Sequence, residues 1–535
     1  MTGFAQHMII LPVILPLFAA AVMLMINERL RKVKVAIGLI TLVTLFAIAW
    51  HLPAAGEAAQ VYALGGWAAP YGIVLVADPL ARMMLLLTSV LGLGAFVFSL
   101  ARWDRAGPRF LPLFMLQIMG INGIFLTGDM FNLFVFFEVM LAASYGLLLH
   151  GSGLARVKAG THYVVINLVA SSLFLIGVSL IYGVTGTLNM ADLALRVTEI
   201  ATENRILLDI GAAVLGVAFL IKVGMWPVGF WLPAAYAAAS APAAAIFAIM
   251  SKVGIYVVLR CILLFSSPDG AVPGAAGFLF YGGIATIVYG SVSVMASRTL
   301  SRIATSCVFI SSGTLLAALA VGGRTVLSGG LFYLLSSTLA VGAFFLLIEL
   351  MNRARGTNAA VLSEPVFSDE YRDPYEDGLP DESQDSVDIP VALALLSAGF
   401  LLSALLLAGL PPMSGFIGKF AIMSGVLDAE RVTPLKVWGL IAVLTASSLA
   451  TLVAVVRIGI EALWTPSDEP PPKVAVAEFS AIAGLLAASI VLTAWSGPIV
   501  ARLDEMALWL HTPGNYVDAV LPCGQSGCAM EKITK

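Results

Sequence analysis

The sequence predicts an all-α membrane protein of about fourteen transmembrane helices with the internally repeated plan of a transporter. Hydrophobic residues make up 60% of the 535 residues and charged residues only 11%, whereas soluble domains are about 25% charged. Fourteen apolar segments are long enough to span a bilayer, which takes about 20 residues. Two of these segments are broken by Pro and Gly, and each carries a single lysine. Paired broken helices of this kind are typical of repeated transporters with ion sites near the middle of the membrane.

The predicted spans follow one another with mostly short connections. The chain begins directly with an apolar segment that contains Pro12 and Pro16 and has no small-residue cleavage site. We therefore expect the first span to be retained rather than removed as a signal peptide. In chain order, the predicted spans are residues 7–27, 33–52, 73–101, 109–127, 130–150, 159–184, 206–231, 242–266, 275–297, 302–322, 326–351, 390–425, 435–463 and 475–497.

Basic residues gather in every second connection. They follow spans one, three, five, nine and eleven, and none lies between spans two and three or between spans four and five. Because Lys and Arg are enriched in cytoplasmic loops, the odd-numbered connections are predicted to be cytoplasmic and both termini to face outward. The basic residues of these connections are Arg29, Arg31, Lys32, Lys34, Arg102, Arg105, Arg109, Arg156, Lys158, Arg298, Arg302, Arg353 and Arg355.

Two polar segments stand apart from the spans. Residues 364–388 hold ten acidic residues against the single Arg372, and such a stretch cannot bury enough apolar surface to fold alone. It is predicted to be a solvated cytoplasmic linker, the alternative being that it gathers cations at a pore mouth. Cys523 and Cys528 in the tail have no second ligand pair, so unpaired thiols or a disulfide are expected rather than a metal site.

Glu138 and Lys222 are predicted to lie near the middle of the membrane. Glu138 is about ten residues from either end of the fifth span, and Lys222 is central in the seventh, beside the break at Gly224 and Pro227. A charged side chain at the bilayer centre costs about 2.5–3.5 kcal/mol, so it is seldom retained without a role. An opposite charge nearby keeps a buried carboxylate ionised. We interpret the two as a functional pair, with a structural ion pair as the alternative.

Lys252 and Lys419 extend this set. Lys252 is central in the eighth span with no acidic residue within a helical turn. It is interpreted as a proton-relay group rather than as a lysine that reaches an interface. Lys419 follows a break formed by Pro411, Pro412 and Gly415. Unwound backbone there lets water and ions approach; the alternative is a lysine near a helix end that reaches the outer surface.

Other polar residues receive structural interpretations. Asp129 is expected to cap the helix that contains Glu138. Ser171, in the sixth span, is expected to take part in helix packing, the alternative being an interhelical hydrogen-bond donor or a group that hydrates a path. Glu349 is followed by Arg353 at i+4 and is interpreted as one half of an interfacial ion pair.

Four sequence motifs together resemble the antiporter-like subunits shared by Mrp cation/proton antiporters and respiratory NADH dehydrogenase. The motifs are 128–138 (Gly-Asp-Met-Phe-Asn-Leu-Phe-Val-Phe-Phe-Glu), 222–233, 251–256 and 409–419. The amino-acid sequence of the first motif is most similar to that of the Mrp D subunits. The resemblance runs over nearly all of the first 500 residues.

The resemblance implies a fold and a function. The fold would contain two inverted five-helix repeats, spans 4–8 and 9–13, each with a broken helix. The function would be to pass protons along a hydrated axis within a complex of several subunits in the bacterial inner membrane. That complex would exchange Na+ or K+ for protons across the lipid bilayer, without a cofactor or metal, and serve pH and cation homeostasis. The implied relay residues are Glu138, Lys222, Lys252 and Lys419. The implied divisions are 1–108 (three N-terminal helices), 109–270 and 271–465 (the repeats) and 466–535 (last helix and tail).

The eleventh span departs from the family pattern. Related subunits often have a His or Lys there, whereas residues 331–341 of this span offer no titratable group except Tyr333. Ser336, Ser337 and Thr338 can hold water, so the second half of the relay is predicted to depend on a water chain.

Two other functions stay open at this point. One is a proton-pumping membrane subunit of an NADH:quinone oxidoreductase or hydrogenase-type complex, although the chain has no iron–sulfur, haem or nucleotide motif of its own. The other is a scaffold that has lost transport. A nucleic-acid partner is not expected, because the net charge is only -3 and no basic tract occurs.

Overall fold

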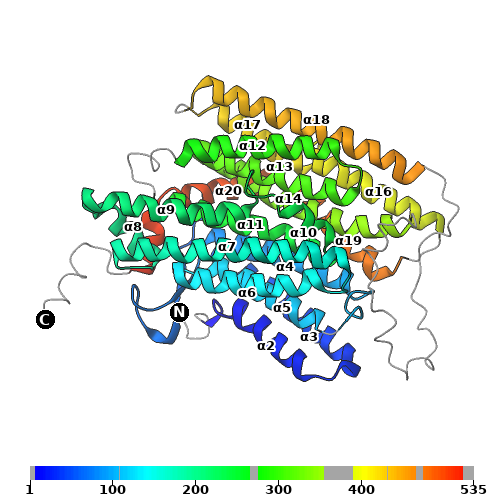
Figure 1. The fold of residues 1–535 in the computed structure, drawn as a ribbon, viewed down its shortest axis with the longest axis horizontal. Helices are drawn as coiled ribbons and strands as arrows, with labels where there is room; N and C mark the ends of the chain where they lie inside the picture. Colours follow the sequence, from blue (N-terminus) through cyan, green and yellow to red (C-terminus); the bar gives the residue numbers. More distant parts are fainter. Residues whose placement is uncertain are drawn as a thin grey trace.

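The protein is a bundle of long helices. The computed structural model describes residues 7–107, 109–265, 275–354, 389–429, 432–464 and 474–521. Figure 1 shows most of its helices lying side by side along one direction, which is horizontal in that view. The acidic segment 364–388 and Cys523 and Cys528 lie outside the described residues.

The elements are helices apart from one two-stranded hairpin in the described part of the chain. In order they are α2 (Leu11–Met25), the 3-10 helix η1 (Glu28–Leu30), α3 (Arg31–His51), β1 (Gln60–Ala63), the 3-10 helix η2 (Leu64–Gly66), β2 (Val74–Ala77), α4 (Pro79–Ser99), α5 (Phe110–Leu126), α6 (Met130–Leu149), α7 (Leu154–Thr185), α8 (Met190–Glu199), α9 (Thr202–Val223), α10 (Leu232–Ala238), α11 (Ala241–Phe265), α12 (Ala275–Ala296), α13 (Leu300–Val321), α14 (Arg324–Ala354), α16 (Ile389–Ala408), α17 (Ser414–Leu427), α18 (Pro434–Trp464), α19 (Val476–Ala494), α20 (Ser496–Leu510) and α21 (Pro513–Val520).

The prediction of an all-α membrane protein is confirmed. Within the described residues, eleven helices are long and apolar enough to cross a membrane, and α2, α5, α16 and α17 are shorter apolar helices. Each of the fourteen predicted spans overlaps one of these helices or, for the twelfth, the pair α16 and α17. The chain is therefore a multi-pass membrane protein.

Two predicted span boundaries were wrong for local reasons. The third span was expected from residue 73, but Val74–Ala77 is a strand that pairs with β1. The helix begins only after Asp78, whose carboxylate accepts a hydrogen bond from the Ala81 N–H at 2.8 Å, with Pro79 at the first helical position. The seventh span was expected to continue to residue 231, but α9 ends at Val223 because Gly224 adopts a left-handed conformation with φ of 81°.

The element order repeats once. The series α5, α6, α7, α9–α10 and α11 contains two helices, a third of 32 residues, a broken helix and one further helix. The series α12, α13, α14, α16–α17 and α18 has the same order, and its third helix has 31 residues. In both series the third helix packs on the broken helix, α7 on α9 and α14 on α17. The inverted relation between the series and the division at residues 108, 270 and 465 stay predictions.

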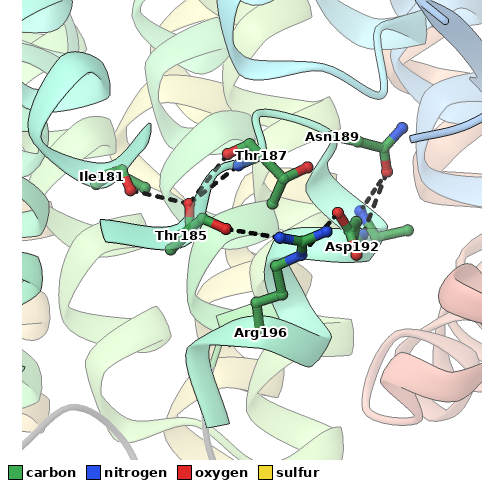
Figure 2. Close-up of polar contacts among 7 residues, drawn as sticks. Ile181, Thr185, Thr187, Asn189, Asp192 and Arg196 are labelled. Atoms are coloured by element: carbon green, nitrogen blue, oxygen red, sulfur yellow. Dashed lines mark hydrogen bonds and ion pairs between the residues drawn. The ribbon is translucent and has the colours of Figure 1, made fainter. Parts of the chain in front are cut away.

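A short connection holds one end of α7 against α6. Asn189 caps α8 by accepting hydrogen bonds from the N–H groups of Ala191 and Asp192, at 3.0 and 3.3 Å. Arg196 forms an ion pair with Asp192 at 3.0 Å and donates to the Thr185 carbonyl at 2.9 Å, as Figure 2 shows. The same connection bonds to the start of α6, because the Met130 N–H donates to the Leu188 carbonyl at 2.9 Å.

A continuous series of packed helices crosses the bundle. α6 packs on α7, α7 on α9, α9 on α11, α11 on α14, α14 on α17, and α17 on α18. In Figure 1 this series runs across the helix direction, from the α6 side near the bottom to α18 at the top. Side chains from these helices can therefore form a path that is perpendicular to the helix axes.

Glycines bring α12 and α13 into backbone contact. A Cβ added at Gly313 would lie 2.7 Å from the Gly283 carbonyl oxygen and 2.9 Å from the Ile287 nitrogen. Small residues permit this close approach, which stabilises helix pairs in membranes through van der Waals contact.

We expect Gly313→Ala to destabilise the chain by about 1–3 kcal/mol, because the added methyl meets backbone atoms that cannot move aside. The matched control is Gly484→Ala in α19, where nothing lies within 4 Å of an added Cβ. That change should stabilise the chain by about 0.5–1 kcal/mol, the usual gain of Ala over Gly within a helix. Thermal unfolding of the purified protein in detergent measures both; equal effects of the two changes would contradict the close contact.

Candidate proton-relay site

Glu138 lies in the middle of α6 and is half-buried. Its carboxylate accepts a hydrogen bond from the Ser171 hydroxyl of α7. Packing was expected for Ser171, with an interhelical hydrogen bond as the alternative. The structure shows the alternative, and this contact adds a residue to the site. At the start of α6, Asp129 accepts a hydrogen bond from the Asn132 N–H at 2.8 Å, which confirms the predicted cap. Burial raises the pKa of Asp129, while the backbone N–H groups of Asn132 and Phe131 oppose this shift.

Lys222 lies in the last turn of α9 and is 6% exposed. Its ammonium group is 4.8 Å from the centre of the Phe137 ring and has no hydrogen-bond partner among the described residues. The Glu138 carboxylate acts on it electrostatically, but within the described part of the chain the two form no ion pair within 4.0 Å. The structure therefore brings the predicted pair to one junction of α6, α7 and α9, with Phe137 rather than Glu138 in contact with the ammonium group.

The break after Lys222 is closed by protein groups. Gly224 and Met225 both donate to the Leu220 carbonyl, at 3.1 and 3.0 Å, which ends α9. The Trp226 N–H donates to the Thr286 hydroxyl of α12 at 3.0 Å, and the Trp231 indole donates to the Ile221 carbonyl at 3.1 Å. Backbone groups freed inside a membrane protein must find such partners, and here side chains supply them.

The second break has the same cap but holds its lysine differently. Gly409 has φ of 71°, and Gly409 and Leu410 both donate to the Leu405 carbonyl at 3.1 Å. The Lys419 ammonium comes back to this break from α17 and donates to the Ala408 carbonyl at 3.4 Å and to the Ser448 hydroxyl of α18 at 2.7 Å. Because the free carbonyls at a helix C-terminus carry partial negative charge, the end of α16 stabilises this ammonium.

Lys252 lies in the centre of α11 and is 2% exposed. No hydrogen bond or ion pair joins it to another described residue. α11 approaches the end of α9 so closely that a Cβ at Gly254 would be 2.7 Å from the Val223 side chain and 3.4 Å from the Lys222 carbonyl carbon. Lys222 and Lys252 therefore come from helices whose backbones meet next to both lysines.

The neutral part of the bundle between Lys252 and Lys419 contains hydroxyl groups and a small cavity. Ser311 of α13 donates to Ser337 of α14 at 2.9 Å, and Ser336 of α14 bonds to Ser414 at 2.8 Å. The Thr338 hydroxyl instead returns to its own helix, at the Leu334 carbonyl. The cavity has a volume of about 10 Å³, close to the smallest that holds one water. Its lining includes Cys307, Ser311, Tyr333, Ser337, Leu406 and Thr451.

Residues beyond Lys252 on α11 were missed by the sequence analysis. Tyr256 and Arg260 follow Lys252 at i+4 and i+8, so the three share one face of the helix. The Tyr256 hydroxyl donates to the Phe125 carbonyl at 2.7 Å, and Arg260 donates to the Tyr256 oxygen at 2.9 Å. Arg260 forms a buried ion pair with Asp78, the cap of α4. The spacing of four was the signal in the sequence that could have found this series.

The chain matches a known family of membrane proteins. Residues 127–367, which include Glu138, Lys222 and Lys252, match the family described as NADH:quinone oxidoreductase/Mrp antiporter, TM. A protein of Rhizobium meliloti (strain 1021), named as the probable D subunit of a K(+)/H(+) antiporter, is 49% identical over 541 residues, covering 98% of this chain and 100% of the relative. The D subunit of the Na(+)/H(+) antiporter of Bacillus subtilis (strain 168) is 32% identical over 531 residues, covering 96% and 99%.

A solved structure supports the same relationship. A chain in the structure of the Mrp complex from Dietzia sp. DQ12-45-1b superposes with a TM-score of 0.82 at 26% sequence identity, and the match covers 97% of this chain and 100% of that one.

We expect Lys222→Met to stabilise the chain by about 1–3 kcal/mol, because a buried donor without a partner costs this much or more when it is charged. Lys419→Met should bring no gain, since the Lys419 ammonium has two hydrogen-bond acceptors. Thermal unfolding of the two variants in detergent checks the contrast. An equal rise for both would show that the partners of Lys419 do not stabilise it.

Proposed function

Since this chain belongs to the NADH:quinone oxidoreductase/Mrp antiporter family, we propose that it is the proton-translocating subunit of a multi-subunit monovalent cation/H+ antiporter of the Mrp type. Its place is the bacterial cell membrane, where it works with other subunits as a secondary transporter rather than as an enzyme. The relatives at 49% and 32% identity that carry antiporter names and match over nearly their whole length support this proposal.

One observation carries the proposal: ionisable groups lie deep in an apolar bundle on helices that pack in series. Glu138 is on α6, Lys222 on α9, Lys252 on α11 and Lys419 on α17. Ionisable residues inside membrane bundles mark proton and ion pathways because their retention is otherwise costly. The two helix breaks place two of the four lysine and glutamate groups beside free helix ends.

The geometry supports a stepwise transfer. The Glu138 carboxylate attracts the ammonium of Lys222; when a proton reaches Glu138, this attraction is lost and Lys222 can release its own proton toward Lys252. From Lys252 the proton continues through water at Ser311 and Ser337 toward Lys419. The cavity at these serines is small, so this last step requires the helices to separate enough to admit further water.

We propose K+ as the principal exchanged cation, because the relative with 49% identity is named for K+ and the one with 32% for Na+. Proton flux in vesicles that contain the whole complex, with K+, Na+ and Li+ compared at equal concentration, tests the choice. A larger flux with Na+ than with K+ would overturn it.

Glu138→Gln should reduce exchange by about 10²-fold or more, the lower end of what a positioned proton-transfer group contributes, with the complex still assembled. The change removes a titratable charge at nearly constant volume. Dissipation of a pH gradient on addition of K+ or Na+ to everted vesicles measures it. Undiminished exchange would remove Glu138 from the mechanism. As a control, Ser171→Ala keeps the Glu138 carboxylate and should cause a smaller loss of exchange.

Lys222→Ala separates a transporter from a scaffold that has lost transport. A scaffold keeps the full exchange activity of the complex, because its buried lysine has no part in the reaction. If Lys222 carries protons, the variant complex assembles in normal amount and exchange falls to the level of vesicles without the complex. Comparison of exchange with the amount of assembled complex distinguishes these results.

A further inference from the structure

A buried acidic group outside the relay, Glu349, lies near the end of α14. Glu349 is 3% exposed. The Trp103 indole donates to both of its carboxylate oxygens, at 2.9 and 2.8 Å. Arg353, one turn further on, is 3.4 Å from Glu349, which confirms the predicted ion pair. The same Arg353 nitrogen, however, is only 2.5 Å from Glu478 of α19.

Arg353 therefore has its closer partner elsewhere. Glu478 lies at the start of α19 and also accepts a hydrogen bond from the Ala475 N–H at 3.0 Å. Gain of a proton by Glu349 leaves the Arg353–Glu478 pair in place, so Glu349 can change its charge without unpairing a buried arginine. Besides Arg353, the charged groups that act on Glu349 are Glu478, Arg102 and Arg156; the Arg156 guanidinium lies 5.1 Å from the centre of the Trp103 ring.

Glu349 lines a polar cavity of about 50 Å³, which we call the Glu349 cavity. One water needs about 10–15 Å³, so the Glu349 cavity has room for about three. Ser240 also lines it, is 1% exposed, and has a hydroxyl without a hydrogen-bond partner among the described residues. Buried hydroxyls rarely stay unpaired, which points to water as the ligand. The lining includes Tyr236, Ser240, Ser301, Phe345, Glu349 and Asn352.

The Glu349 cavity lies at the end of the bundle where the basic connections begin. Ser301 stands next to Arg302 at the start of α13, and Glu349 stands one turn before Arg353. Basic residues of this kind favour the cytoplasmic face. The Glu349 cavity therefore lies close to the aqueous phase on that side.

The same cavity lies on the helix of Lys252. Ala244, in the first turn of α11, lines it, and Lys252 follows eight residues later, which is about 12 Å along the helix. Tyr236 and Phe345 line the cavity, and Phe247 packs on Tyr236 with ring centres 5.6 Å apart. The Tyr236 hydroxyl donates to the Phe247 carbonyl at 2.8 Å. These aromatic rings close the cavity toward Lys252 in this conformation.

We propose that the Glu349 cavity is the site where the relay exchanges protons with the water on the side of the basic connections, and that Glu349 is the residue that carries the proton. A hydronium ion gives its proton to the Glu349 carboxylate and becomes water. When the rings of Tyr236, Phe247 and Phe345 move apart and admit further water, the carboxylic acid gives the proton through this water to the neutral amine of Lys252, which becomes an ammonium while the carboxylate is restored. The reverse sequence releases a proton to the water.

This inference rests on the proposed function, and its test uses vesicles that contain the whole complex. Glu349→Gln should lower cation-driven proton flux about tenfold or more, within what a proton-transfer group contributes, and should flatten its dependence on the pH at the basic side. Glu478→Gln is the matched control: it alters a buried carboxylate on the same arginine that does not line the cavity. Loss of the Glu478 charge leaves Arg353 to pair with Glu349 alone, so most of the flux should remain and its profile should shift to lower pH without flattening. Ser240→Val, which fills the cavity and leaves the ion pairs intact, should also lower the flux.

The outcomes separate the inference from its premise. Wild-type vesicles without exchange would refute the proposed function. Infrared difference spectra of the purified complex then still decide the role of Glu349: acidification should give a protonated carboxyl band that Glu349→Gln removes and Glu478→Gln retains. Where the wild type exchanges, a Glu349→Gln profile equal to that of the wild type, or equal losses at every pH in both glutamine variants, overturns the inference. If Glu349→Gln does not assemble, unchanged flux in Ser240→Val overturns it.

Discussion

The main physical constraint on this structure is that ammonium groups lie inside an apolar bundle and must be stabilised there. A cation there is stable only beside negative charge, helix-end carbonyls or an aromatic face. The protein uses all three. Glu138 acts on Lys222 through space, Phe137 lies under the Lys222 ammonium, and the end of α16 receives Lys419. Each of these stabilising contacts requires a break in a helix or a close approach of two helices. The glycines and prolines of the breaks therefore help to place the charged groups.

The two halves of the bundle use this arrangement differently. In the first, the lysine precedes the break on the same helix, and a second lysine follows on the next helix, α11. In the second, the lysine follows the break, and the helix after it, α18, offers the Ser448 hydroxyl, to which Lys419 donates. The first half thus holds two buried lysines and a carboxylate, while the second holds one buried lysine with two acceptors. This difference places three of the four proposed relay groups, Glu138, Lys222 and Lys252, in the first half. The path from there to Lys419 depends on water.

Much of the fold and of the candidate site was predictable from the sequence, because a membrane strongly restricts the structures that a chain can form inside it. Apolar segments of sufficient length must be helices there, so each predicted span coincides with an apolar helix or, for the twelfth, a pair of them. Charges inside such segments are conspicuous, which identified Glu138, Lys222, Lys252 and Lys419. Short elements were not foreseen: β2 looked like the start of a span because Val74–Ala77 is wholly apolar, and α8, α20 and α21 are too short or too polar to give a clear signal. An interhelical hydrogen bond of Ser171 was only the alternative to packing, and its partner Glu138 was not foreseen, since serine in a membrane helix takes part in packing as well as in hydrogen bonding.

The sequence by itself determined the class of protein, the positions of the apolar helices, the place of both breaks and the identity of the ionisable groups inside the bundle. These follow from composition and from the local chemistry of Gly, Pro and Lys. Only the tertiary structure decided which groups meet. It placed Phe137 rather than Glu138 against the Lys222 ammonium, gave Arg353 to Glu478 more closely than to Glu349, and left the Ser240 hydroxyl unpaired in a cavity. Such contacts join residues on different helices, and their distances depend on how the helices pack, which no local pattern along the chain records.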